Sequence, residues 1–113
     1  MADLCIQVHP HRSPDLNLVD VREICERIAD DDTLVHRFSV VEGTDNHYYV
    51  NLMFSTDRLE ALWQQLQRRL YESEGVGAAM QRSSMAMCEG MNGWDDYLLL
   101  RHVDPKVRCD RFT

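Results

Sequence analysis

The sequence predicts an α+β domain in which two helices cover one face of an antiparallel sheet. Three observations support this fold class: short segments in which apolar and polar residues alternate, two longer segments with apolar residues at three- and four-residue steps, and turn residues between them. Their order, strand, helix, strand, strand, helix, strand, is that of a ferredoxin-like sandwich (βαββαβ), which an additional C-terminal strand follows. The length of 113 residues fits a single domain, residues 1–113.

The first two elements differ in their apolar period. Residues 4–8 alternate, which predicts a half-buried strand that Pro10 closes. From Asn17, a favourable N-cap, apolar residues recur at helical spacing as far as Ala29. Three acids follow, and because a helix C-terminus disfavours negative charge, we expect the helix to end at residue 29 or 30.

A hairpin is expected next. Residues 34–41 and 47–55 both alternate, and residues 42–46 between them are rich in the types that tolerate tight turns. On the second of these strands we expect four side chains to face the core: Tyr48, Val50, Leu52 and Phe54.

The remaining sequence predicts a second helix and two more strands. A regular stripe of leucines begins near Asp57 and runs to about Tyr71, with Asp57 and Glu60 spaced as a capping box. Gly75 and Gly77 stop this helix, as a C-cap and linker do. Beyond them we expect a mostly extended segment, a turn and a final strand, at residues 80–89, 90–93 and 96–103.

Composition excludes several classes of protein. With 19 acidic residues against 12 lysines and arginines, the net charge is −7, and the excess lies mostly before Glu60. Such a field disfavours direct nucleic-acid binding and speeds encounter with a basic protein, although solubility alone is an alternative explanation. No apolar run is long enough to span a membrane, and residues 1–14 lack the features of a leader, so we expect a cytoplasmic protein.

The candidates for chemistry are few and scattered. His9 and His11 flank Pro10 and would form a metal site if a third ligand came near, from His36, His47 or His102; surface histidines are the alternative. Nucleophiles beside a base are suggested only at Cys88, which precedes Glu89, and at Ser83 and Ser84. The four cysteines are Cys5, Cys25, Cys88 and Cys109, and their lack of motif spacing favours reduced thiols. We therefore predict no catalytic, metal or cofactor site.

Two further patterns point to surfaces. The methionines at positions 80, 85, 87 and 91 suit either core or subunit packing or an adaptable binding surface. Acids and an aromatic residue also gather in three segments expected to be turns or strand ends, a combination that suits an interface for a basic partner. The predicted partner-binding residues are Asp30, Asp31, Asp32, Glu42, Asp45, Trp94, Asp95 and Asp96. The alternative is a solvated loop with Trp94 packed against the core.

In its size, its acidic balance and the closing pattern from Gly90 to Leu100, the chain resembles the small immunity proteins of contact-dependent growth-inhibition and polymorphic toxin systems. The resemblance implies a cytoplasmic inhibitor that binds a cognate toxin domain, often a nuclease, and occludes it. Two other classes stay open. One is a small ferredoxin-like enzyme or ligand-binding regulator, acting as a homodimer, that uses the sheet face bearing His47, Tyr49 and Asn51. The other is a structural subunit of a larger assembly.

Overall fold

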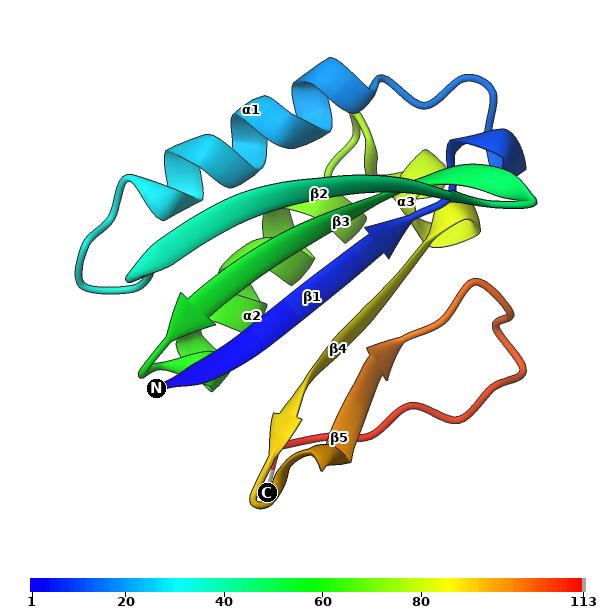
Figure 1. Ribbon diagram of the computed structural model, residues 1–113. Coiled ribbons are helices and arrows are strands. Elements are labelled where there is room, and N and C mark those ends of the chain that lie inside the picture. Colours follow the sequence, from blue (N-terminus) through cyan, green and yellow to red (C-terminus); the bar gives the residue numbers. More distant parts are fainter. Residues whose placement is uncertain (113) are drawn as a thin grey trace.

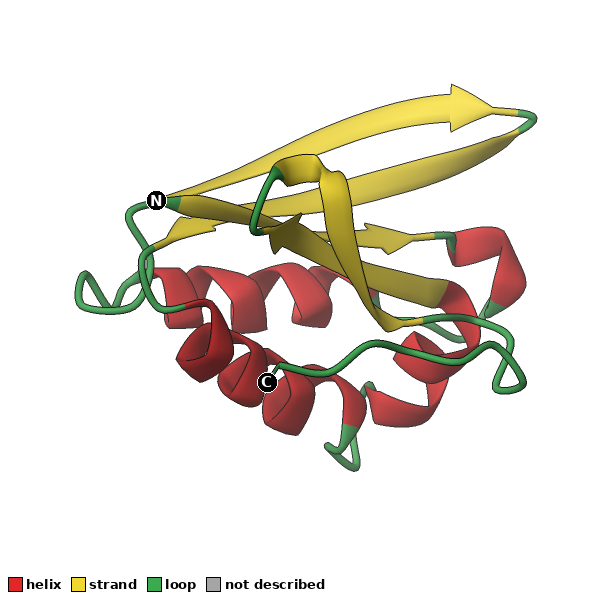
Figure 2. Cartoon of the chain, turned by 90° about the horizontal axis from the view of Figure 1, so that it is seen from below, coloured by secondary structure: helices red, strands yellow, loops and turns green. Residues whose placement is uncertain are grey.

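The computed structural model describes residues 1–112 and shows an α+β fold. Five strands form one antiparallel sheet in the order β2-β3-β1-β4-β5. Three α-helices lie on one face of this sheet, and no helix of residues 1–112 lies on the other (Figures 1 and 2). The predicted class, α+β with an antiparallel sheet, is confirmed, while the predicted number of helices is wrong.

The centre of the sheet is β1 (Ala2–Val8), which pairs on one side with β3 (His47–Thr56) and on the other with β4 (Ser84–Gly90). The edges are β2 (Arg37–Asp45) beside β3 and β5 (Gly93–Arg101) beside β4. Alternate residues of the central strands point toward the helices and form the core with them. These residues are Leu4, Ile6, Val8, Val50, Leu52, Phe54, Ala86 and Cys88.

Helix α1 (Leu18–Ala29) begins and ends where the sequence predicts. The Asn17 side chain accepts a hydrogen bond from the backbone N–H of Asp20, which satisfies one of the free donors of the first turn. The helix ends at Asp30, so the three acids lie at its end and in the following loop. Before α1, the short 3-10 helix η1 (Pro10–Arg12) turns the chain away from β1.

Helix α2 (Leu59–Leu66) continues as a turn of π-helix, η2 (Gln67–Tyr71). The predicted capping box is wrong, because the N-cap position belongs to Arg58 and no side chain caps it. Asp57 instead binds the N-terminal amine at 3.2 Å and Nε2 of His36 at 2.7 Å. These two partners come from distant parts of the chain, so local spacing did not indicate them.

Residues 80–83, predicted to begin an extended segment, belong instead to helix α3 (Gly77–Ser83), which starts at a glycine predicted to lie in a linker. One side of α3 is buried, and Met80 is completely enclosed in the core. A Cβ atom at position 77 would lie 2.7 Å from the carbonyl oxygen of Tyr71, so a glycine permits the close approach of η2 and α3. A segment of only seven residues, such as α3, has too few apolar positions to distinguish the apolar spacing of a helix from the alternation of a strand.

The β2–β3 hairpin is longer and tighter than predicted. Its strands reach Asp45 and His47, leaving only Asn46, whose φ of 63° lies in the left-handed region that asparagine tolerates. Tyr48, expected in the core, is 42% exposed because this end of the hairpin extends beyond the buried cluster. Within residues 1–112, no helix is both long and apolar enough to cross a bilayer.

Candidate protein-binding surface

The β4–β5 hairpin exposes large apolar side chains at its end. Met91 is 98% exposed, Trp94 41% and Tyr97 53%, and Trp94 is not part of the core. The turn depends on two glycines: Gly93 adopts a φ of 74°, and a Cβ atom at Gly90 would overlap the carbonyl oxygen of Asp96. Because Trp94 is exposed and does not belong to the core cluster, the alternative of a tryptophan packed against the core is wrong.

Two free carboxylates lie between these aromatic residues. Asp95 and Asp96 are both exposed. Every salt bridge found within residues 1–112 lies elsewhere: Met1 with Asp57, His36 with Asp57, and Arg82 with Asp15. We call Met91, Trp94, Asp95, Asp96 and Tyr97 the acidic hairpin surface. It combines rigid aromatic area with charge that no arginine or lysine of the described chain neutralises.

The other predicted contact residues do not join this surface. Asp30, Asp31 and Asp32 lie in and before the α1–β2 loop, where Asp31 accepts hydrogen bonds from the backbone N–H and the hydroxyl of Thr33. These bonds lower the pKa of Asp31. The loop lies at the same end of the sheet as the β4–β5 turn but beside the opposite edge strand, β2 (Figure 1).

Glu42 and Asp45 lie toward the other end of β2. The carboxylate of Glu42 accepts a hydrogen bond from the hydroxyl of Tyr48, which raises the pKa of that tyrosine. Asp45 is the last residue before the hairpin turn. The eight predicted residues are thus divided among three places, and the structure brings together only Trp94, Asp95 and Asp96.

Near Asp45, the structure brings three histidines together. The rings of His11 and His47 are stacked with their centroids 3.9 Å apart, and His9 lies edge-on to His11 at 6.0 Å. They line a pocket of about 350 Å³ together with five other residues, Gln7, Arg12, Asp45, Asn46 and Tyr49. We call this group the histidine pocket. The sequence named His47 among three possible third members, and only folding selects it.

Two imidazoles of the histidine pocket, those of His9 and His11, have lowered pKa values, which favours their neutral form. Burial, then the charges of Arg12 and His11, lower the pKa of His9. Desolvation, then the charges of His47 and Arg12, lower the pKa of His11. His36 and His102 lie elsewhere, the first against Asp57 and the second accepting a hydrogen bond from the backbone N–H of Asp104. Across residues 1–112, no group of three or more His, Cys, Asp or Glu side chains is placed to hold a metal ion.

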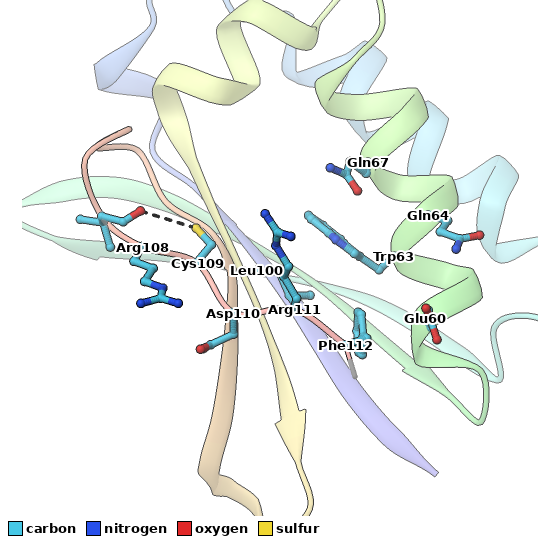
Figure 3. A pocket seen from close by; sticks show the side chains of 11 residues that line it. Glu60, Trp63, Gln64, Gln67, Leu100, Arg108, Cys109, Asp110, Arg111 and Phe112 are labelled. Atoms are coloured by element: carbon cyan, nitrogen blue, oxygen red, sulfur yellow. Dashed lines mark hydrogen bonds between the residues drawn. The ribbon is translucent and has the colours of Figure 1, made fainter.

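A cavity of about 630 Å³ lies between α2 and the C-terminal segment. Figure 3 shows Trp63 of α2 and Gln67 of η2 on one side and Arg111 and Phe112 on the other. The thiol of Cys109, in the same cavity, donates a long hydrogen bond of 3.9 Å to the carbonyl oxygen of Val107. A carbonyl is not a base that activates a thiol, so these contacts form no nucleophile and base pair.

The other candidate nucleophiles have structural partners. The hydroxyls of Ser83 and Ser84 donate to the carbonyl oxygens of Ala79 and Met80, one helical turn earlier. Cys88 is completely buried, and burial raises its pKa to about 11, with smaller contributions from the charges of Glu89 and Asp110. A thiol with so high a pKa is protonated at neutral pH and is a weak nucleophile.

Comparison with known proteins adds no relative: no family model, curated protein or solved structure matches this chain.

Proposed function

We propose that this chain is a protein-binding module that engages a basic partner through its acidic hairpin surface. The observation that supports the proposal is the exposure of Trp94 and Tyr97 beside Asp95 and Asp96, two carboxylates without an ion-pair partner among the described residues. Aromatic residues contribute most to affinity at interfaces, and charge determines encounter rate and register.

The partner class follows from the resemblance noted in the sequence. In this proposal the chain is a cytoplasmic immunity or inhibitor protein, and the partner is a toxin domain whose active site or substrate path it occludes. Contact falls on Trp94, Asp95 and Asp96, while Asp30, Asp31 and Asp32, at the same end of the sheet, contribute to the long-range field. Glu42 and Asp45 lie at the other end and fall outside the contact.

The finer description of the fold is also a proposal. We infer a ferredoxin-like arrangement for β1, α1, β2, β3, α2 and β4, in which α3 precedes β4 and β5 is added at the edge. The order of elements along the chain supports this description. Strand β5, which forms a hairpin with β4, would then be the addition that distinguishes this protein.

Charge reversal at one hairpin residue tests the function. The partner is captured with the full chain from its native cells and then purified, and association rates are measured at low and high salt. We expect Asp95→Lys to slow association about three- to tenfold at low salt, because steering depends on local charge. Glu74→Lys makes the same change in net charge in the exposed turn after η2 and should leave the rate nearly unchanged. Equal effects of both substitutions would contradict a local contact.

A specific observation favours a second candidate function, the binding of a small anionic ligand in the histidine pocket. Arg12 provides a permanent positive charge, and three imidazoles, Asn46 and Tyr49 provide further hydrogen-bond donors. The test is titration with inorganic phosphate, followed through the imidazole proton resonances. Saturable shifts of His9, His11 and His47 that His47→Gln abolishes would support it, and unchanged resonances at millimolar phosphate would exclude it.

A further inference from the structure

The sheet face opposite the helices is apolar at its centre. Cys5 pairs with Met53 on β3 and with Met87 on β4, and Met87 pairs in turn with Leu99 on β5. The neighbours of these residues along each strand belong mostly to the core, and side chains alternate between the two faces of a strand. These four residues and Met85, which precedes Met87 by two positions, therefore lie on the same, helix-free side. We call Cys5, Met53, Met85, Met87 and Leu99 the open sheet face.

The open sheet face is separate from the core that the helices cover. None of its five residues belongs to the core cluster, and Leu99 and the three methionines are only half-buried. Figures 1 and 2 show no helix on this side, and the C-terminal segment runs on the helix side. The row from β3 to β5 crosses three strand spacings, or about 14 Å, which accommodates one α-helix of about 10 Å diameter.

The border of this face is negatively charged at one end. The strands of the sheet contain two arginines: Arg37 lies on the open side of the edge strand β2, and Arg101 lies on the helix side, 4.7 Å from the centre of the Tyr71 ring. Asp3 and Glu89 lie on the open side at one end of the face, where Glu89 accepts from the backbone N–H of Asp3.

The open sheet face shares two strands with the acidic hairpin surface. Leu98 pairs with the core residue Cys88 and Leu99 pairs with Met87, so Leu99 points to the open side, and the register shifts between these pairs and the turn. Tyr97 is 53% exposed and follows Asp95 and Asp96 on β5. The acidic hairpin surface is thus carried by the same two strands, β4 and β5, that contribute Met85, Met87 and Leu99 to the open sheet face.

We propose that the open sheet face binds an amphipathic helix of the partner, with its apolar side on the methionines and its lysines or arginines toward Asp3 and Glu89. This inference rests on the proposed protein-binding function and names the element that the partner supplies. Methionine side chains adapt to different apolar surfaces, and a basic amphipathic helix matches both the apolar centre and the acidic border.

The test uses a designed leucine and lysine peptide of about 15 residues, long enough to form a helix on contact, and a chain with isotope-labelled methionine methyl groups. We expect saturable shifts of the Met53, Met85 and Met87 methyl signals. Met80, buried in the core, serves as the internal control and should not respond. A second peptide with glutamate in place of lysine should not bind, and equal binding of both peptides would overturn the charge argument.

Variants localise the contact. The double substitution of Met53→Gln and Met87→Gln should weaken binding about tenfold or more, while Val19→Gln, at an exposed valine of α1, should not. If the double variant does not fold, the methyl shifts of the unchanged chain still show whether the peptide binds to the open sheet face. Methyl signals that do not change when the peptide is added overturn the inference. The inference is also overturned if sedimentation shows a dimer of this chain and the methyl shifts change with the concentration of the chain itself.

The same spectra separate this inference from the proposed function. A response confined to the indole N–H of Trp94 overturns the open sheet face as the docking site and leaves the acidic hairpin surface in place. Methyl shifts without a change in the indole N–H signal of Trp94 support the open sheet face as the docking site and count against contact at the acidic hairpin surface.

Discussion

Tyr71 shows how a polar group is accommodated in the core. Its side chain is 1% exposed, and the serine at position 84 already donates its hydroxyl proton to the carbonyl oxygen of Met80. The 2.6 Å contact between the two hydroxyls is therefore a bond that Tyr71 donates to Ser84. The guanidinium of Arg101 lies over the same ring, so one buried side chain joins η2, β4 and β5.

Removing that hydroxyl measures the bond. We expect Tyr71→Phe to lower the free energy of unfolding by about 1 kcal/mol, the net value of one intramolecular hydrogen bond. Denaturant unfolding provides the measurement. Tyr97→Phe removes a hydroxyl from an exposed side chain and should cost almost nothing, so equal losses in the two variants would contradict the assignment.

The stacked histidines make stability depend on pH. Because folding lowers the pKa values of His9 and His11 from an ordinary 6.5, the unfolded chain binds more protons in this range. Their contribution to stability is complete above about pH 6.5 and is lost as the pH falls below that value. Asp15, Asp31 and Asp57 have lowered pKa values too, but their contribution is lost only near and below the ordinary value of 3.8.

Melting temperatures between pH 7 and pH 5 test this effect of the histidines. We expect the unchanged chain to melt at a lower temperature at pH 5, and His47→Gln to reduce the difference, because it removes a charge that opposes protonation of His11. His102→Gln removes a histidine outside the pocket and serves as the control. A pH dependence that both variants share would show that the stack is not its origin.

Elements with a long, regular pattern could be predicted from the sequence, and short ones could not. Helix α1 has an N-cap residue, a stripe of apolar residues at helical spacing and a run of acids at its end, and its observed bounds match the prediction. Helix α3 has seven residues and none of these signals. The cap of α2 was predicted from spacing alone, but contacts with the N-terminus and His36, distant in sequence, determine where Asp57 lies.

The β4–β5 hairpin depends on a glycine at its narrowest point. We expect Gly90→Ala to cost about 2 kcal/mol, because the new methyl group would overlap backbone at Asp96 and the strands would have to separate. Gly75→Ala is the matched control, since a Cβ atom there meets nothing within 4 Å. Unfolding midpoints compare the two variants. A neutral Gly90→Ala would mean that the hairpin is looser than the structure shows.

At the scale of the whole molecule, the sequence predicted the types of residue in the site but not their grouping. Trp94, Asp95 and Asp96 are consecutive, so local sequence was enough to place them together. The acids of the α1–β2 loop and of the β2–β3 hairpin lie toward opposite ends of β2, so the length of that strand separates them. The methionines of the open sheet face and the three histidines also come together only through strand register and the fold.

The most direct test of a protein-binding role observes the two tryptophans at once. The nitrogen-labelled chain is mixed with the unlabelled partner captured from its native cells, and the indole N–H signals are followed by NMR. We predict that Trp94 shifts or broadens together with the amides of Asp95 and Asp96, while Trp63, a residue of α2 that is 7% exposed, stays unchanged. A complex that shifts Trp63 or the histidine pocket and leaves Trp94 unaffected would contradict the account.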